Sequence, residues 1–335
     1  MSAVDRQMMS RALQLAAKGR YTSAPNPSVG CVIARDDSII GEGFTRPAGG
    51  NHGEIEALQQ ASDTAGATAY VTLEPCSHQG RTGPCADALV AAGISRVVIA
   101  CEDPNPEVAG SGIQKLKDAG IEVELGLMED QARESNRGFI KRHEQGMPWV
   151  TVKMAASLDG RTAMASGQSQ WITTPAARAD VQRLRAAQCA IITGIGTQKM
   201  DDPSLTVRIT RDDVGVEDEL RQPLRVVVDA RLQMSPEARM FQQPGDTLVA
   251  TLDGPEQRDR SAALEAAGAE VAFLPAMGEH IDLHALLVEL AGRGCNQVLV
   301  EAGAGLAGAF IAEGLQDELV CYWAPKLFGN EARPM

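Results

Sequence analysis

The sequence has no long hydrophobic run, no excess of positive charge and no cysteine framework. No stretch approaches about 18 uninterrupted apolar residues, and the first residues lack an export-signal pattern, so we expect neither a membrane span nor secretion. A net charge of -13 argues against general binding to nucleic acid or to an anionic membrane. The seven cysteines lack the spacing of a small disulfide-rich scaffold, which favours the reducing cytoplasm.

The length and composition are those of a globular protein with more than one domain. A single core stops growing near about 250 to 300 residues, and this chain has 335. Hydrophobic residues make up 44% of the chain and charged residues 22%, as in ordinary globular proteins. A turn at residues 144–146 followed by Pro148 marks a break. We therefore expect two domains, residues 1–146 and 147–335.

Strands and helices alternate in both halves, which predicts layered α/β structure. The first half predicts a helix at 5–18, a hairpin around Asp36 and Asp37, strands at 69–73, 96–100 and 122–125 with helices between them, and one closing helix at 128–142. The second half predicts strands at 149–155, 190–193, 224–229, 247–252, 270–274, 297–301 and 318–324, and helices at 175–187, 255–267, 281–291 and 306–312. Residues 211–221 are polar and acidic, so we expect a surface loop there.

Four residues suited to metal and proton chemistry lie between positions 52 and 85. His52 and Glu54 open a helical pattern, Cys76 follows a strand, and Cys85 precedes a second helical run. A catalytic zinc takes three protein ligands and keeps a fourth position for water, a count that His52, Cys76 and Cys85 satisfy. Glu54 is then free to act as general acid and base, as the glutamate does in zinc nucleobase deaminases.

Two other interpretations of these residues stay open at this point. The deaminase signature has two residues between its cysteines, whereas eight separate Cys76 from Cys85. A closed structural zinc site would need a fourth ligand, for which His78 is the nearest candidate. The two cysteines could also be core residues beside an unrelated histidine.

Glycine-rich turns follow two predicted strands of the second half. One lies at residues 191–197, and the other carries Gly303, Gly305 and Gly308 at the start of a helix. Such turns let backbone N–H groups approach a phosphate. The second turn lies near the chain's end, and the strand after it has no carboxylate at its end, unlike a Rossmann unit. We interpret it as a phosphate-binding loop of another α/β fold, although the glycines could simply pack a helix on the sheet.

Taken together, these residues resemble the bifunctional deaminase-reductases of riboflavin biosynthesis. The likeness spans nearly the whole chain and rests on residues 25–30, His52-Gly53-Glu54, residues 74–85, residues 157–161 and Glu301-Ala302-Gly303. It accounts for the eight-residue gap between the cysteines. It implies an α/β fold of two three-layer domains, the N-terminal one cytidine-deaminase-like and the C-terminal one dihydrofolate-reductase-like.

The resemblance also implies two reactions. The first is zinc-dependent hydrolytic deamination of 2,5-diamino-6-(5-phosphoribosylamino)pyrimidin-4(3H)-one, and the second is NADPH-dependent reduction of the product's ribosyl side chain to ribityl. We therefore expect Zn2+ and NADPH as cofactors and a small phosphoribosyl pyrimidine as substrate. We expect a cytoplasmic homo-oligomer, a dimer or tetramer, with no nucleic-acid or membrane partner.

Roles for individual residues follow from the same resemblance. It places zinc on His52, Cys76 and Cys85, the proton shuttle on Glu54, and the pyrimidine against Asn26 and His78. NADPH would contact Ala155, Trp171, Thr197, Asp201 and the run Gly303, Ala304, Gly305, Leu306, Ala307, Gly308 and Ala309. The reductase substrate would contact Ser169, Arg185, Leu205, Arg208 and Glu301, with the arginines on its phosphate. Glu56 and Gly83 depart from the family pattern, and neither receives a role.

Two rival functions are less favoured. A nucleic-acid base deaminase would carry a basic strip studded with aromatic residues, and the acidic chain has none. A zinc-stabilised nucleotide sensor would not need a spare glutamate two residues from a metal ligand. The presence of Glu54 therefore favours catalysis.

Overall fold

The computed structural model describes residues 1–78, 83–164 and 172–335 and divides the chain into two compact units. The first unit comprises Met1–Gly146 and Gly215–Leu220, and the second comprises Met147–Val214 and Arg221–Met335. The acidic stretch expected to be one surface loop instead begins with a short helix, α9 (Arg211–Val214), and its residues Gly215–Leu220 pack with the first unit.

The first unit is built on a five-stranded sheet in the order β2-β1-β3-β4-β5. Its strands are β1 (Gly30–Arg35), β2 (Ser38–Phe44), β3 (Thr68–Val71), β4 (Arg96–Ile99) and β5 (Glu122–Leu125). The first three strands pair antiparallel and the last three pair parallel. The predicted hairpin around Asp36 and Asp37 is confirmed, and Asp36 takes a positive φ of 51° at the turn.

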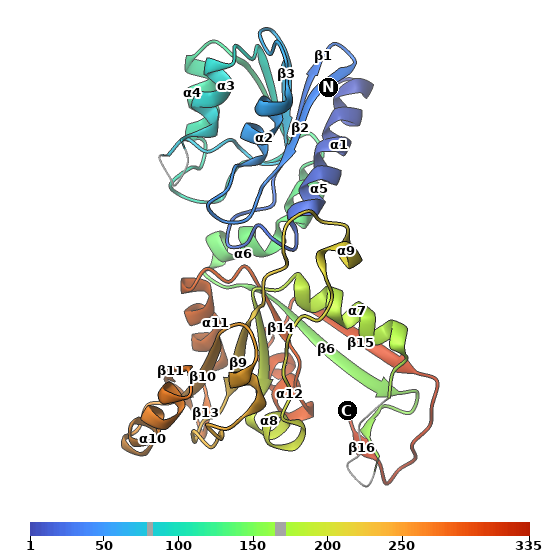
Figure 1. Ribbon diagram of the computed structural model, residues 1–335, viewed down its shortest axis with the longest axis vertical. Coiled ribbons are helices and arrows are strands. Elements are labelled where there is room, and N and C mark those ends of the chain that lie inside the picture. The colour runs from blue at the N-terminus through green and yellow to red at the C-terminus, as the bar shows by residue number, and fades with distance from the viewer. Residues whose placement is uncertain (79–82, 165–171) are drawn as a thin grey trace. The chain divides into compact units, whose positions relative to one another are not determined.

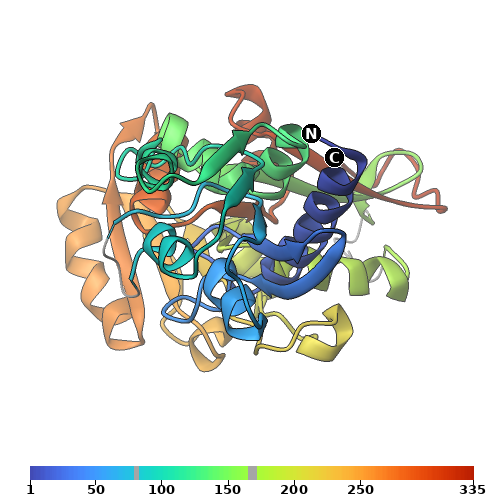
Figure 2. The same cartoon turned by 90° about the horizontal axis from the view of Figure 1, so that it is seen from above.

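Helices cover both faces of this sheet. They are α1 (Ala3–Gly19), α2 (Gly53–Gln60), α3 (Cys85–Ala91), α4 (Ser111–Asp118), α5 (Glu129–Ser135) and α6 (Arg137–Gln145). A Cβ atom on Gly30 would clash with the Ala12 carbonyl oxygen of α1, and one on Gly43 would clash with the Gly53 carbonyl oxygen of α2. Gly43 pairs with Cys31, the chain neighbour of Gly30, so the two glycines face opposite sides of the sheet. Figures 1 and 2 show α1, in dark blue, and α2, in lighter blue, on either side of the strands.

The single closing helix predicted at 128–142 is wrong, because the helix breaks at Asn136. This residue has φ -118° and ψ 20°, outside helical values, and it separates α5 from α6. Its buried side chain donates to the Ser28 carbonyl oxygen at 3.0 Å and accepts from the Ser28 N–H at 2.8 Å. The break is therefore fixed by a contact 108 residues away in the chain.

The second unit is built on a seven-stranded sheet in the order β11-β10-β9-β8-β14-β6-β15, with every neighbouring pair parallel. Its strands are β6 (Trp149–Ser157), β8 (Ala190–Gly194), β9 (Leu224–Val228), β10 (Thr247–Leu252), β11 (Ala269–Leu274), β14 (Gln297–Val300) and β15 (Glu318–Ala324). Two small pairs, β7 (Arg161–Ala163) with β16 (Arg333–Pro334) and β12 (Ala276–Met277) with β13 (His280–Ile281), lie outside it.

The helices of this unit are α7 (Pro175–Ala186), α8 (Ile195–Asp201), α9, the 3-10 turn Arg239–Gln242, α10 (Pro255–Ala266), α11 (Leu283–Gly292) and α12 (Ala304–Ala312). Residues 195–197, expected to belong to a glycine-rich turn, instead begin the helix α8, because Ile195 packs on the core and Gln198 is buried. The helix expected from residue 281 begins at Leu283, because Asp282 accepts the Ala285 N–H at 3.0 Å and caps it.

The direction of the strand connections reverses at the carboxyl ends of β8 and β14. The chain leaves β8 through α8 toward β9 on one side, whereas it leaves β14 through α12 and passes β6 to reach β15 on the other. Ligands of open α/β sheets bind where the connections that leave two neighbouring strands run to opposite sides in this way. In the described ranges, no helix has the length and apolar content needed to span a bilayer.

Candidate active sites

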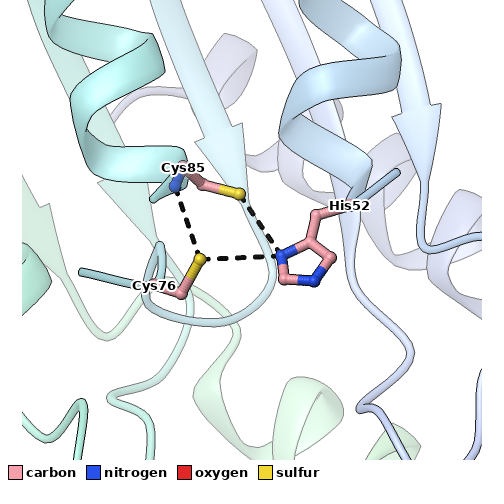
Figure 3. Close-up of side chains that lie close together, drawn as sticks. All are labelled: His52, Cys76 and Cys85. Carbon is pink, nitrogen blue, oxygen red and sulfur yellow. Dashed lines mark hydrogen bonds between the residues drawn. The ribbon is translucent and has the colours of Figure 1, made fainter. Parts of the chain in front are cut away.

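The three predicted zinc ligands come from three elements that meet in the first unit. His52 is the N-cap of α2, Cys85 is the first residue of α3, and Cys76 lies in the loop that follows β3. Figure 3 shows the three side chains pointing toward one another. The fold thus brings together His52 and Cys76, which are 24 residues apart in the chain, and Cys85, which follows Cys76 by 9 residues.

The spacing of the ligand atoms fits a zinc ion. The Nδ1 atom of His52 lies 3.6 Å from the Cys76 Sγ and 3.3 Å from the Cys85 Sγ, and the three ligand atoms all lie within 4.8 Å of one another. Tetrahedral zinc with ordinary Zn–S and Zn–N lengths separates its ligand atoms by about 3.5 to 3.8 Å. Among the described residues this group has three members, and the exposed His78 is not one of them.

One of the three ligands, Cys76, favours the deprotonated form that zinc needs. A hydrogen bond from Cys85 and the nearby His52 lower the pKa of the Cys76 thiol to about 4, although burial opposes the shift. The same pairing raises the pKa of Cys85, and the hydrogen bond to Cys76 raises the pKa of His52. The Cys85 N–H also donates to the Cys76 sulfur at 3.4 Å, so the start of α3 supports a thiolate there.

Glu54 lies beside this cluster in the first turn of α2 and is 3% exposed. Burial, followed by the charge of Cys76, raises the pKa of its carboxyl group to about 7. A carboxyl group with this pKa can both accept and release a proton near neutral pH. Its protonation therefore suits the general acid-base role predicted from the sequence.

The two predicted pyrimidine contacts lie on loops of the same unit. Asn26 is half-buried in the loop before β1, and its backbone N–H donates to the Ser23 carbonyl oxygen at 3.0 Å. Two hydrogen bonds from the Asn136 side chain to the backbone of Ser28 hold the next turn of this loop.

Asp103 was missed by the sequence analysis. It is 6% exposed, and burial raises its pKa to about 6, with Cys76 and His78 among the charges that act on it. An acidic residue just after a strand's carboxyl end was the available signal.

Glu56, for which the sequence gives no role, organises the loop before His52. Its carboxylate accepts from the Arg46 Nε at 3.0 Å and from the Asn51 amide at 2.8 Å. Arg46 stacks over the Phe44 ring at 4.5 Å and also pairs with Glu217 at 2.8 Å. Glu56 therefore holds the loop that precedes His52 through Arg46 and Asn51.

In the second unit, Glu301 directly follows β14, and Arg185 of α7 pairs with it. The Arg185 guanidinium donates to both Glu301 oxygens, at 2.6 and 3.0 Å, and to the Thr206 carbonyl oxygen at 3.2 Å. Lys153 of β6 lies 3.6 Å from the same carboxylate. Burial raises the pKa of Glu301, but Arg185 and Lys153 outweigh it and hold that pKa below its usual value. Glu301 is thus an anion held by two cations.

The glycine-rich turn fits the phosphate of a dinucleotide. Gly303 is the N-cap of α12, no side chain caps that helix, and Gly303, Ala304 and Gly305 are exposed. Their open N–H groups face a position where an anion is favoured. A Cβ built on Gly303 would lie 3.9 Å from the Thr197 hydroxyl of α8, so the structure brings these predicted cofactor contacts together. Ala307 is fully buried, so its side chain belongs to the core.

The other predicted contacts that the structure describes lie in β6, at the end of α8 and in the loop that follows α8. Leu205 is buried with a positive φ of 48°, and the exposed Arg208 is anchored by its N–H to Gln182 at 2.8 Å. Asp201 ends α8 and is exposed, and Ala155 is half-buried in β6. Ser169 and Trp171 lie outside the described residues.

Comparison with known proteins assigns both units. Residues 2–101 match the cytidine and deoxycytidylate deaminase zinc-binding region, and residues 148–335 match the RibD C-terminal domain. The chain is 50% identical to the riboflavin biosynthesis protein RibD of Escherichia coli over 98% of this chain and 90% of that protein. The chain belongs to the RibD family. The RibD of Haemophilus influenzae is 48% identical over 99% of this chain and 89% of its own length.

Solved RibD structures share the fold. RibD of Acinetobacter baumannii, form 1, has a TM-score of 0.89 at 47% identity and covers 99% of this chain and 90% of that one. A Thermotoga maritima structure has a TM-score of 0.86 at 34% identity, covering 99% and 89%. The predicted α/β fold with a deaminase-like and a RibD reductase domain is confirmed. The chain is a deaminase and reductase of riboflavin biosynthesis whose cofactors are zinc and NADPH.

Proposed function

We propose that residues 1–146 form the deaminase domain and residues 147–335 the reductase domain of this RibD family member. The first would hydrolyse the 2-amino group of 2,5-diamino-6-(5-phosphoribosylamino)pyrimidin-4(3H)-one, and the second would reduce the ribosyl group of the product to ribityl. The Thermotoga maritima relative carries a name that states these two activities, a diaminohydroxyphosphoribosylaminopyrimidine deaminase and a 5-amino-6-(5-phosphoribosylamino)uracil reductase. The buried Glu54 beside the three-ligand cluster carries the proposal for the first reaction.

In the first reaction, His52, Cys76 and Cys85 would hold the metal. Zinc, when bound, makes water a nucleophile near neutral pH. Glu54 would pass one proton of the attacking water to the ring nitrogen. It would then pass the second proton, from the new hydroxyl group, to the amino group, which leaves as ammonia. This role is supported by a carboxyl pKa of about 7, which leaves both protonation states populated. Asn26 and His78 would contact the pyrimidine.

In the second reaction, the side chains position the sugar while NADPH supplies hydride. The N-terminus of α12 and Thr197 would hold the cofactor, together with Ala155, Asp201 and Trp171. Glu301 would accept hydrogen bonds from the sugar hydroxyls as an anion. Arg185 uses three of its five N–H donors on Glu301 and Thr206, which leaves Arg208 as the more open arginine for the phosphate. Ser169 and Leu205 would complete this substrate site.

Replacing Glu54 with glutamine tests the deaminase assignment. The variant should keep one zinc per chain and lose ammonia release by about 100-fold or more, because general acid-base catalysis contributes on that scale. Its NADPH oxidation on the deaminated product should match the parent chain. Deaminase activity that survives with zinc bound would remove Glu54 from the mechanism.

Replacing Arg208 with alanine tests the reductase assignment. The Michaelis constant for the deaminated product should rise by at least tenfold, because a charge-assisted phosphate contact is lost. Arg258→Ala is a matched control, because Arg258 is also an exposed arginine but pairs with Asp253 at 2.7 Å. An unchanged Michaelis constant for Arg208→Ala would argue against the phosphate contact.

We also propose a cytoplasmic homo-oligomer, a dimer or tetramer. None of the seven cysteines forms a disulfide, as in a reducing compartment. The edge strand β15 exposes Leu319 and Trp323, at 51% and 52%, which leaves apolar side chains for a second copy to cover. Light scattering should give two or four chains per particle, and Trp323→Glu should lower that number. A monomeric parent chain would exclude this assembly.

A further inference from the structure

The loop that carries Cys76 is fastened to the N-terminus of α4 by the residues on both sides of it. The Ser77 hydroxyl lies 2.5 Å from the Ser111 hydroxyl at the start of α4. The Pro75 carbonyl lies against Gly112, where a Cβ atom would overlap it. The strongest attachment comes from Glu74, two residues before Cys76.

The Glu74 carboxylate accepts four backbone N–H groups. Its Oε1 accepts from Gly112 at 2.9 Å and Ile113 at 3.1 Å, and its Oε2 accepts from Gly110 at 3.0 Å and Asp103 at 3.2 Å. The side chain is 3% exposed, and its own N–H donates to the Cys101 carbonyl oxygen at 3.0 Å. A carboxylate has about four acceptor positions, so all of them are used inside the protein.

An anion is the group that this position requires. Helix α4 starts after Gly110, which has φ 77° and supplies no side-chain cap. The first N–H groups of the helix therefore need outside acceptors, and the positive end of the helix favours a negative charge. Glu74, in the loop after β3, supplies the acceptor oxygens and the negative charge. The helix start and the Cys76 loop are consequently held as one piece.

We propose that Glu74 is a positioning residue of the zinc site, which fixes the backbone of Cys76 so that its sulfur stays in ligand position. Cysteine has a short side chain, so the place of its sulfur depends on the backbone that carries it. The Cys76 Sγ reaches the His52 Nδ1 and the Cys85 N–H, at 3.6 and 3.4 Å, only while that backbone is held. Outer partners of metal ligands typically contribute 10- to 100-fold to metal affinity. The inference rests on the proposed zinc ligands.

Glu74→Gln in the full-length, zinc-loaded chain tests this role. Glutamine keeps the shape but turns one acceptor oxygen into an NH2 group that faces N–H donors. Zinc affinity, measured by competition with a chromogenic chelator, should fall 10- to 100-fold. The ligand-field absorption of the cobalt(II)-substituted protein should change, because the sulfur moves. NADPH oxidation on the deaminated product should stay at the parent rate, which shows that the second unit is intact.

Two further variants separate positioning from general destabilisation. Asp5→Asn breaks a buried network with Arg96 and Tyr70 in the same unit, at 2.8 and 2.9 Å, without touching the Cys76 loop. At an equal drop in melting temperature it should keep the parent zinc affinity. Gly112→Ala should favour the helix by propensity yet push the Pro75 backbone, so it should lose zinc affinity by at least tenfold. If Glu74→Gln does not fold, Gly112→Ala decides the question by the same titration.

The outcomes that overturn the proposal are distinct from those that overturn the ligand assignment. Zinc affinity of Glu74→Gln within twofold of the parent, or an equal loss in Asp5→Asn, removes the positioning role. If Glu74→Gln does not fold, unchanged affinity in Gly112→Ala removes it. Cys76→Ser should bind zinc far more weakly than any of these variants. If Cys76→Ser binds zinc like the parent chain, the ligand assignment itself is wrong, and the role of Glu74 falls with it.

Discussion

Replacing Asn136 with alanine would release the loop that carries Asn26. The Asn136 amide makes two buried hydrogen bonds to the backbone of Ser28, at 2.8 and 3.0 Å. Alanine leaves the Ser28 N–H and carbonyl without these partners, and each unsatisfied buried group costs about 1 to 3 kcal/mol. We therefore expect the first unit to lose about 2 to 6 kcal/mol of unfolding free energy.

The chain offers an internal reference for this measurement. All three tryptophans, Trp149, Trp171 and Trp323, belong to the second unit, so their fluorescence reports its unfolding alone. Urea unfolding followed by circular dichroism should show an earlier transition of the first unit, while the fluorescence midpoint should not move. The Michaelis constant of the deaminase should rise because Asn26 is less well placed, with NADPH oxidation on the deaminated product unchanged.

Ser135→Ala is the matched control for Asn136→Ala. Its hydroxyl donates to the Ala132 carbonyl oxygen at 2.8 Å and accepts from the Asn136 amide only at 3.5 Å, so its loss should cost less than about 1 kcal/mol. An Asn136→Ala chain that unfolds like Ser135→Ala would refute the reasoning. A loss of stability with no change in the Michaelis constant of the deaminase would also refute it, because the Asn136–Ser28 hydrogen bonds would then not position Asn26.

Three further outcomes follow from the structure. Arg185→Met should lower the tryptophan-reported stability of the second unit by about 3 kcal/mol, because it leaves the buried Glu301 short of a partner; an unchanged urea midpoint would count against the pair. Arg96 holds the pKa of Asp5 below its usual value, so this stabilisation is present above the unfolded pKa of about 4 and is lost as pH falls toward the folded pKa. Acid unfolding of the first unit should therefore be shallower in Asp5→Asn, and equal slopes would contradict the assignment. Removing zinc with a chelator should stop ammonia release and spare NADPH oxidation on the deaminated product; loss of both would show that the metal also serves the second unit.

The zinc cluster could be predicted because each ligand stands at a local boundary. His52 and Cys85 lie at helix starts and Cys76 follows a strand, and these patterns are visible in a short window of sequence. The meeting of the three residues follows once the elements pack in layers. The individual roles of most reductase residues, including Arg185 and Arg208, rest on the resemblance, since a single arginine in a sequence is more often a surface charge.

The features missed from the sequence depend on contacts between distant residues. The break at Asn136 comes from Ser28, and the cap of α4 comes from Glu74, 36 or more residues away. The insertion of β14 between β8 and β6 is set by sheet pairing, which alternating patterns do not encode. Glu56 received no role because its partner Arg46 precedes it by ten residues in a loop rather than along a helix.

A paired assay on the phosphoribosyl diaminopyrimidine tests the central claim most directly. Ammonia release and NADPH oxidation are followed together with the zinc-loaded chain. We predict that ammonia appears first, without NADPH, and that NADPH is oxidised only as the deaminated product accumulates. In Glu54→Gln both signals should vanish and supplied deaminated product should restore NADPH oxidation. Oxidation of NADPH without ammonia release would contradict the assignment of the two reactions to this chain.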